Sequence, residues 1–284
     1  MNLIERVVKK EIKCLERIKD TFEDRFDYLR LDKNERIVPF KKKMLDEFKS
    51  MVRSEDISGY TELTPTYRKV ASYLRMSPNQ ILFASGSDLA IKSVYEACVN
   101  RGDNVVLHMP SFAMYRVYAL MFGAKFKSVP IKEDWSPDLE RMLDAVDSKT
   151  KIMVLENPNG FIGTKLTFAQ LKFCAVELKK KNTLLLIDEA YHFIENRTSS
   201  SFNLIPKYSN VIISQTFSKC HGLAGARFGY LVGDPGLMQY ISRVRPMHEI
   251  TGLTARAVEW ILNHIEILND YQKGLELSDA GFRF

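Results

Sequence analysis

The sequence lacks several features that would assign it directly to a class of protein. No apolar run reaches the roughly 20 residues that a membrane-spanning helix needs. Residues 1–20 are charged throughout and have no apolar core of the kind found in secretion signals. The four cysteines lie far apart and show neither metal-site nor disulfide spacing: Cys14, Cys98, Cys174 and Cys220. We therefore expect a cytoplasmic protein with no membrane segment and no bound metal.

Long runs of one charge are also missing. The 284 residues carry a formal net charge of +6, but the basic runs Lys41–Lys43 and Lys179–Lys181 are short, and no nucleic-acid-binding module surrounds them. A solvated surface is the favoured interpretation, and a basic nucleic-acid binder is the last-ranked alternative. With 45% hydrophobic and 27% charged residues, the composition is that of an ordinary globular protein. A basic protein would also suit an anionic cofactor or substrate.

Short apolar runs alternate with amphipathic segments along most of the chain. The runs predict strands at 81–84, 104–108, 125–129, 151–156, 183–187, 211–213 and 230–232. The segments between and around them predict helices near 40–52, 66–74, 88–100, 137–146, 168–181, 235–244 and 253–268. This rhythm predicts an α/β domain with a largely parallel, buried sheet. Residues 1–29 have helical spacing and predict an N-terminal helix packed on the body or on a second subunit.

One stretch, residues 214–230, carries the strongest chemical signal. Lys219 lies among small and hydroxyl residues between two apolar runs, where burial would lower the pKa of its amine. A neutral lysine amine can attack a carbonyl, as a Schiff-base lysine does. Arg227 offers a planar fork of donors suited to a phosphate, and Thr216 and Ser218 add hydroxyls. The alternative is an ordinary loop lysine with an arginine at a strand edge.

The order Thr-x-Ser-Lys followed by Gly-Leu-Ala-Gly-x-Arg-x-Gly-Tyr resembles fold-type-I pyridoxal-phosphate (PLP) aminotransferases of class I and II, especially the histidinol-phosphate aminotransferase branch. Leu31–Arg36 is loosely similar to another segment of that family. The resemblance implies a three-layer sandwich with a mostly parallel central sheet, PLP as cofactor and a homodimer. It also implies an amino donor and a keto acid as substrates, with Lys219 as the lysine that holds PLP and moves the proton.

A second turn is a candidate phosphate site. Gly86, Ser87 and Asp88 follow a predicted strand and begin a helix, whose free amides and positive dipole end suit a phosphate. Serine and aspartate are also ordinary helix caps, so the pattern alone is weak. The family resemblance implies that these three residues form the phosphate cradle.

Two aromatic residues are assigned through the resemblance. Phe112 matches the position of a ring that stacks on the cofactor pyridine, and core packing is the alternative. Tyr60 matches a tyrosine that reaches the cofactor phosphate of the neighbouring subunit, and a buried structural tyrosine is the alternative.

An acidic residue ends the predicted strand 183–187. A buried carboxylate such as that of Asp188 is costly without a partner. In the family a protonated pyridine nitrogen is that partner, which keeps the ring able to accept electrons. Tyr191 would donate to the ring oxygen and tune the lysine bond. The alternative for Asp188 is a helix N-cap.

The loop Glu156–Gly163 departs from the family pattern. The asparagine that faces the cofactor in relatives falls on Gly160, and the following Pro-Thr is replaced by Phe161-Ile162. Asn157 or Asn159 could substitute if the loop is re-routed.

The resemblance also organises the chain. It implies an N-terminal helical arm and segment over 1–50, a large PLP-binding domain over 51–250, and a linking helix with the start of a small domain over 251–284. The rest of that small domain, with its carboxylate-binding arginine, is expected to be absent. An aminotransferase is the main prediction. A decarboxylase of the same fold and a PLP-binding protein with little catalysis are the alternatives.

Overall fold

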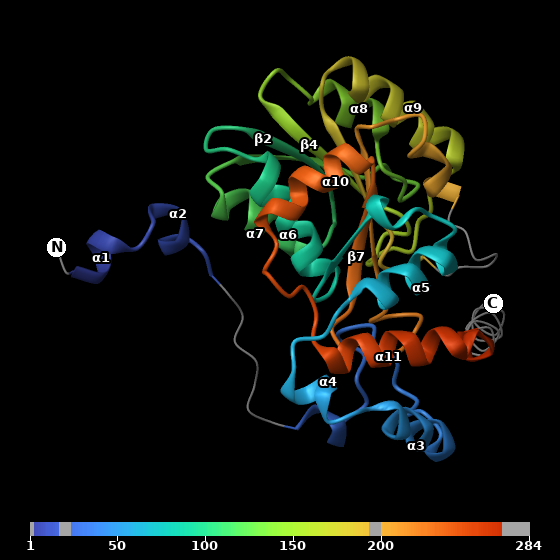
Figure 1. Cartoon of the computed structure of the whole chain (residues 1–284). Helices are drawn as coiled ribbons and strands as arrows, with labels where there is room; N and C mark the ends of the chain where they lie inside the picture. Colours follow the sequence, from blue (N-terminus) through green and yellow to red (C-terminus); the bar gives the residue numbers. More distant parts are fainter. Residues whose placement is uncertain (1–2, 17–23, 193–199, 269–284) are drawn as a thin grey trace.

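Seven strands form one mixed sheet at the centre of the computed structural model, which describes residues 3–16, 24–192 and 200–268 (Figure 1). Across the sheet the strand order is β1-β7-β6-β5-β4-β2-β3. The strands are β1 (Ile81–Ala84), β2 (Asn104–Met109), β3 (Lys125–Pro130), β4 (Thr150–Glu156), β5 (Leu184–Asp188), β6 (Val211–Thr216) and β7 (Gly229–Gly233). All seven lie where the apolar runs of the sequence predict them.

Five of these strands run parallel to one another. β3, β2, β4, β5 and β6 pair in that order, and β7 is antiparallel to both β6 and β1. Because parallel strands end at the same edge, Glu156 of β4 lies in register beside Asp188 of β5. That edge collects the loops in which ligands bind in sheets of this kind.

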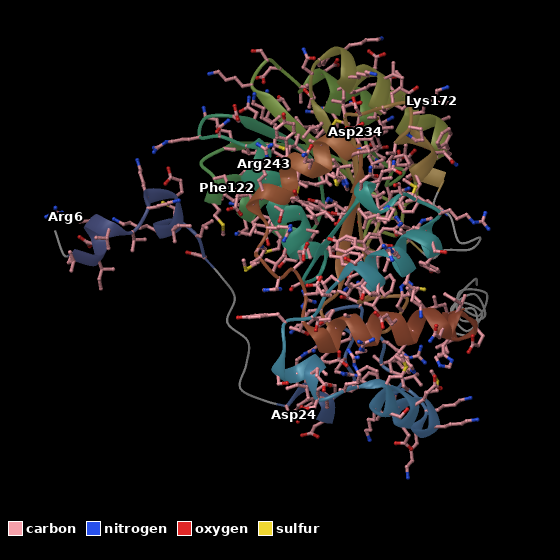
Figure 2. All side chains as sticks on the ribbon, in the orientation of Figure 1. Arg6, Asp24, Phe122, Lys172, Asp234 and Arg243 are labelled. Carbon is pink, nitrogen blue, oxygen red and sulfur yellow. The ribbon has the colours of Figure 1, made fainter. Side chains whose placement is uncertain are left out.

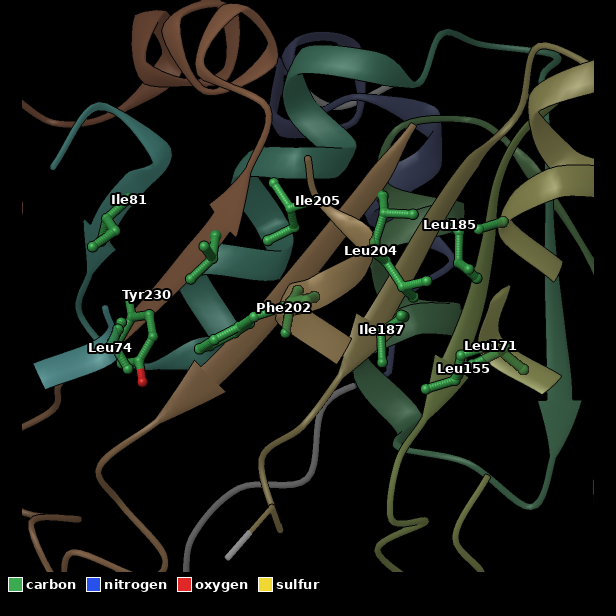
Figure 3. Close-up of a cluster of buried hydrophobic side chains, with 14 of the residues drawn as sticks. Leu74, Ile81, Leu155, Leu171, Leu185, Ile187, Phe202, Leu204, Ile205 and Tyr230 are labelled. Carbon is green, nitrogen blue, oxygen red and sulfur yellow. The ribbon is translucent and has the colours of Figure 1, made fainter. Parts of the chain in front are cut away.

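The sheet has an apolar layer on each face because successive side chains of a strand point to opposite sides. On β4, Met153 and Leu155 belong to one buried cluster, and Ile152 and Val154 belong to the other. Figure 3 shows the first cluster, in which Leu155, Ile187 and Tyr230 from three strands meet Phe202 and Leu204 (Figure 3). A layer of helices on either side of the sheet gives the predicted three-layer sandwich.

The helices of the described residues are α1 (Leu3–Val7), α2 (Lys10–Lys13), α3 (Lys42–Met51), α4 (Glu55–Ser58), α5 (Thr64–Leu74), α6 (Ser87–Cys98), α7 (Ala113–Met121), α8 (Leu139–Asp144), α9 (Phe168–Lys180), α10 (Pro235–Ile241) and α11 (Gly252–Asn263). Among them, α3, α5, α6, α8, α9, α10 and α11 lie close to their predicted ranges. Short 3₁₀ turns are η1 (Arg25–Asp27), η2 (Pro78–Gln80), η3 (Ser200–Leu204) and η4 (Ser242–Val244). Residues of α6, α7 and α10 belong to one apolar cluster, and residues of α5, α8, α9 and α11 belong to the other.

The N-terminal segment differs from its prediction. In place of one helix, the described part of residues 1–29 has two short helices, α1 and α2, with no buried residue in either. The apolar side chains of Leu3 and Val7 are each 70% exposed, and Figure 2 shows Arg6 of α1 at the periphery of the molecule (Figure 2). Helical spacing was a poor guide because short isolated helices need tertiary packing to be stable.

Helix α11 packs against α3, α4 and α5 beside the large domain. Asp56 of α4 is buried and accepts a hydrogen bond from Nε of Arg256 on α11 at 2.9 Å. The guanidinium keeps the pKa of this carboxyl well below its usual range. Residues 269–284, where the start of a small domain is expected, lie outside the described residues. The division into 1–50, 51–250 and 251–284 remains a prediction.

Candidate active site

A cavity of about 680 Å³ lies at the carboxyl-terminal edge of the parallel strands. Its walls come from the ends of β4, β5 and β6, the starts of α6 and α7, and the N-terminal segment Leu31–Asn34. The predicted site residues that line it are Ser87, Asp88, Phe112, Asp188, Tyr191, Thr216, Ser218, Lys219 and Arg227. Residues from four separate stretches of sequence therefore line one cavity.

One end of this cavity, the cradle end (Gly86, Ser87, Thr216, Ser218 and Arg227), is rich in hydrogen-bond donors. The Thr216 hydroxyl donates to the Ser218 hydroxyl at 2.9 Å, or to the Phe228 carbonyl at the same distance. Ser87 is the first residue of α6, so its end of the cavity also receives the free amides of a helix N-terminus. A guanidinium, hydroxyls and such amides together suit a phosphate.

Position 86 needs a glycine because the Arg227 guanidinium packs directly against it. Its φ is +89°, in the region that favours glycine. A Cβ added at Gly86 would lie 2.4 Å from an Nη atom of Arg227. The residue is buried and does not itself line the cavity, so its role in the predicted cradle is to make room for the guanidinium.

Lys219 is placed at the cavity by the turn after β6. Its side chain is half-buried, which is less than the burial expected from the flanking apolar runs. Its Nζ donates to the Lys33 carbonyl at 2.5 Å and lies 5.2 Å from the centre of the Tyr191 ring. The turn is polar and open on the cavity side. The apolar strands that flank it in sequence therefore led to too high an expectation of burial for Lys219.

Asp188 is 5% exposed at the end of β5. Its Oδ2 accepts from the Tyr115 hydroxyl at 2.5 Å, and its Oδ1 accepts from the Ala190 amide at 3.0 Å. Burial raises the pKa of this carboxyl to about 6, while the bonds from Tyr115 and Ala190 and the charge of Lys219 lower it. A buried acid of this kind favours a cationic hydrogen-bond donor as ligand.

A second part of the cavity, the ring end (Glu156, Gly160 and Tyr191), is where the sequence departs from the family. The Tyr191 ring lies against Gly160, so close that a Cβ at that position would be 2.5 Å from a ring carbon. The Tyr191 hydroxyl accepts from Nδ2 of Asn34 at 3.2 Å. A tyrosine ring therefore occupies the space that a side chain at position 160 would need.

The two candidate replacement asparagines hold the loop together instead. Asn157 Oδ1 accepts from the Leu166 amide at 2.8 Å. Asn159 Oδ1 accepts from the Phe161 amide at 2.8 Å, and its Nδ2 donates to the Pro110 carbonyl at 3.0 Å. Both are 2% exposed and neither lines the cavity. Both side chains therefore lie away from the cavity, and the substitution of one of them for the missing donor stays a prediction.

Tyr60 also lies away from this cavity. It is 86% exposed, and its ring stacks on the His248 ring with centroids 4.3 Å apart. The alternative of a buried structural tyrosine is wrong for this residue. Phe112 is 39% exposed at the cavity and meets the Tyr115 ring edge-on at 5.6 Å.

Two polar residues of the site were missed in the sequence. Tyr115 lies three residues after Phe112, and this helical spacing could have placed its hydroxyl near the same cavity. Glu156 is 4% exposed and, like Asp188, ends an apolar strand. An acidic residue at the end of an apolar run is the sequence pattern that could have identified it. Among the described residues, no group of three or more histidine, cysteine or acidic side chains could hold a metal ion, and none of the helices is long and apolar enough to cross a membrane.

Comparison with known proteins places this architecture in a family. The sequence profile described as aminotransferase class I and II matches residues 27–278. The chain is 37% identical over 180 residues to histidinol-phosphate aminotransferase of Bacillus cytotoxicus, covering 63% of this chain and 48% of that protein. It is 31% identical over 230 residues to histidinol-phosphate aminotransferase 2 of Haemophilus influenzae, covering 80% of this chain and 61% of that protein.

A solved structure agrees with these sequence matches. Histidinol-phosphate aminotransferase from Sinorhizobium meliloti, in complex with pyridoxal-5′-phosphate, superposes with a TM-score of 0.76 at 26% identity, covering 84% of this chain and 65% of that one. The predicted fold type I architecture with a mostly parallel sheet is confirmed. The chain spans about half to three fifths of the length of the two sequence relatives. It belongs to the aminotransferase class I and II family.

Proposed function

We propose that this chain is a PLP-dependent aminotransferase, similar to histidinol-phosphate aminotransferases, that acts on an amino acid or a related amine. The observation that carries the proposal is the meeting of three groups in one cavity: the Lys219 amine, the buried Asp188 carboxyl and the phosphate-suited donors around Arg227. Family membership and the PLP complex of the Sinorhizobium meliloti relative support it.

The residues present fit PLP. The cradle end supplies hydroxyls, a helix N-terminus and a guanidinium, and Gly86 leaves the room that this guanidinium occupies. Asp188 supplies a buried acid for a ring nitrogen, and Phe112 supplies an exposed aromatic face at the cavity. When bound, PLP supplies an electron sink for breaking a bond at the α-carbon of an amino acid.

The proposal gives each side chain a role. Lys219 Nζ would hold the cofactor aldehyde and, when free, would accept a proton from the substrate carbon and return it. Asp188, which is 5% exposed, would pair with a ring N–H⁺. Tyr191, in contact with Gly160 and Asn34, orients the ring end. Lys33 holds the lysine amine in place through its carbonyl oxygen.

We also propose that the protein acts as a homodimer in the cytoplasm, with an amino donor and a keto acid as partners and without nucleic acid. The 86% exposure of Tyr60, outside the cavity of its own chain, supports a role in the site of a neighbouring subunit. The isolated cysteines support a reducing compartment.

The test is a visible-region spectrum with added PLP, before and after borohydride reduction. We expect a reducible band in the wild-type protein and in Lys33→Ala, which removes another lysine of the same cavity, and no such band in Lys219→Ala. Mass spectrometry should place the reduced adduct on Lys219. A band that persists in Lys219→Ala contradicts the proposal. Keto-acid formation separates an aminotransferase from a decarboxylase, which releases carbon dioxide, and from a PLP-binding protein that converts no amino acid.

A further inference from the structure

Glu156 is a second buried acid in the same cavity as Asp188. The two residues end the adjacent parallel strands β4 and β5 and are paired in register. Neighbouring residues of parallel strands point to the same face, and both side chains line the cavity. Their exposed fractions are 4% and 5%. The two carboxyl groups therefore lie on the same face of the sheet, in a poorly hydrated part of the cavity.

The Glu156 carboxyl joins two elements around the cavity. Its Oε1 accepts from the Phe112 amide at 2.6 Å, at the start of α7. Its Oε2 accepts from the Gly160 amide at 3.0 Å, in the loop after β4. The first hydrogen bond holds the backbone that carries the Phe112 ring, and the second holds the backbone of Gly160, which contacts Tyr191. We place both of these groups beside the cofactor.

The titratable groups facing Glu156 come from three elements. Asp188 lies on β5, and Tyr115, whose hydroxyl binds Asp188, lies on α7. His108 on β2 accepts from the Glu156 amide through Nε2 at 3.3 Å, and burial lowers the pKa of this imidazole to about 4. Lys219 is the cation whose charge reaches Asp188. The charge of Glu189, which follows Asp188 in the chain, also acts on Asp188, so the pair of acids faces a neutral imidazole, a phenol, the Lys219 cation and a further carboxyl.

We propose that Glu156 is a positioning residue of the cofactor site that forms an acid pair with Asp188: near neutral pH the pair holds one exchangeable proton, and it releases that proton to water when a ring carrying N–H⁺ binds beside Asp188. The inference rests on the proposed function for the identity of the ring. Charge balances in this step, because one proton leaves the pair as one cation enters.

The energetics favour this arrangement. Burial raises the pKa of Glu156 to about 7, the amides of Gly160 and Phe112 lower it, and the charge of Asp188 raises it further. Ionising both of two neighbouring carboxyl groups costs free energy in a poorly hydrated site, because the two negative charges repel each other. A cation beside Asp188 offsets the repulsion and makes the doubly ionised pair accessible. The ionised form of Glu156 should therefore strengthen binding of a cationic ring.

The test measures the dissociation constant of pyridoxamine 5′-phosphate by fluorescence quenching at pH 5.5 and pH 8.5. Glu156→Gln removes the charge but keeps the shape. Gln can accept from only one of the two amides, so part of its loss is structural and independent of pH. The control is Glu249→Gln, because Glu249 has an 8% exposed side chain hydrogen-bonded to Tyr67 and does not line this cavity.

We expect the ratio of dissociation constants, Glu156→Gln over wild type, to be at least about tenfold larger at pH 8.5 than at pH 5.5. At an effective dielectric constant of about 20, one unit charge about 12 Å away gives a factor of this order and a nearer charge gives a larger one, so tenfold is a lower bound. The ratio for Glu249→Gln should not change with pH. An equal loss at both pH values, or no loss at pH 8.5, overturns the proposal.

A second measurement needs no variant and no PLP chemistry. In wild-type protein labelled with ¹³C at the glutamate side-chain carboxyls, we expect one resonance to titrate near pH 7 without ligand. Saturating pyridoxamine 5′-phosphate should shift its midpoint to lower pH. If no glutamate titrates above pH 6, the acid pair is refuted whatever the protein binds. If one does but pyridoxamine 5′-phosphate fails to bind the wild type, the proposed function fails and the pairing of the acids stands.

Discussion

The two ends of the cavity are built in different ways. The cradle end draws on two short turns, around Gly86 and around Ser218–Arg227, each of which carries its chemistry in a compact run of sequence. The ring end depends on Glu156 and Gly160, at the end of β4 and in the loop after it, and on Tyr191, which follows β5. The Asn34 hydrogen bond to Tyr191 joins residues 157 positions apart.

This difference governs what each end can tolerate. A cradle for phosphate needs donors that point to one place, and a helix N-terminus with a neighbouring turn supplies them locally. The shape of the ring end is set by packing, so loss of a side chain at Gly160 is coupled to the position of the Tyr191 ring. The cradle end should therefore respond to changes of charge, and the ring end to changes of volume.

The largest effect should come from Arg227→Gln at the cradle end. A hydrogen bond to a charged group contributes about 1.5–3 kcal/mol, so losing the fork should raise the dissociation constant of pyridoxamine 5′-phosphate roughly 10- to 100-fold. Arg116→Gln is the control, because Arg116 is exposed on α7 and stacks on Phe126. Binding titrations at fixed ionic strength measure both. Equal affinities for the two variants would remove Arg227 from the cradle.

The next effect concerns Asp188 and pH. Its pKa is raised from 3.8 to about 6, so its stabilising contribution is present below pH 4 and is lost as pH rises through 6. Wild-type protein without ligand should thus be less stable than Asp188→Asn at pH 7.5 by up to about 3 kcal/mol, and similar to it at pH 3.5. Urea unfolding at several pH values gives the difference.

Tyr115→Phe sharpens this prediction. The Tyr115 hydroxyl donates to Asp188 and lowers the pKa of that carboxyl. Without this hydrogen bond the pKa of Asp188 should rise further. We therefore compare the unfolding free energy of Tyr115→Phe with that of the Tyr115→Phe, Asp188→Asn double variant across pH, and expect the pH midpoint of their difference to be higher than in the Tyr115 background. A midpoint that moves to lower pH would be inconsistent with this hydrogen bond.

At the ring end, Gly160→Asn should not repair the departure from the family. The new Cβ would lie 2.5 Å from the Tyr191 ring, and overpacking of this kind costs about 1–3 kcal/mol. Gly163→Asn is the matched control in the same loop, because no atom lies within 4 Å of a Cβ there and asparagine tolerates its positive φ. Unfolding free energies compare the two.

A double variant distinguishes a clash from a general intolerance of the loop. Combining Gly160→Asn with Tyr191→Ala should cost less than the sum of the single changes, because the ring that causes the clash is gone. Additive costs would mean that the Tyr191 ring does not occupy the space beside position 160.

The smallest effect should follow from Asn34→Ala. It removes the exposed hydrogen bond to the Tyr191 hydroxyl, which contributes about 0.5–1.5 kcal/mol at most. We expect less than about a threefold change in affinity for pyridoxamine 5′-phosphate, against none for Asn100→Ala on the surface. A change as large as that of Arg227→Gln would show that the ring end depends on polar contacts as strongly as the cradle end does.

Much of the fold could be predicted because its signals are local. The apolar runs that became the central strands stand out in the sequence, since strands buried on both faces read as continuous hydrophobic segments, whereas the edge strand β3 is largely exposed. Residues 1–29 show the limit of the same method. Their helical spacing is clear, but the described part forms two short α-helices and one 3₁₀ turn with no buried residue, because an amphipathic face needs a partner surface that periodicity does not supply.

By itself, the sequence determined the order of strands and helices and the turns that hold Lys219, Asp188 and Arg227, because each depends on residues close together in the chain. Only the tertiary structure decided the ring end: that Asn157 and Asn159 hold the loop, and that Tyr191 fills the space at Gly160. The pairing of Glu156 with Asp188 was likewise decided by strand register. The physical reason is that packing and burial join residues distant in sequence, and the burial that raises the pKa of those two acids exists only once the sheet has formed.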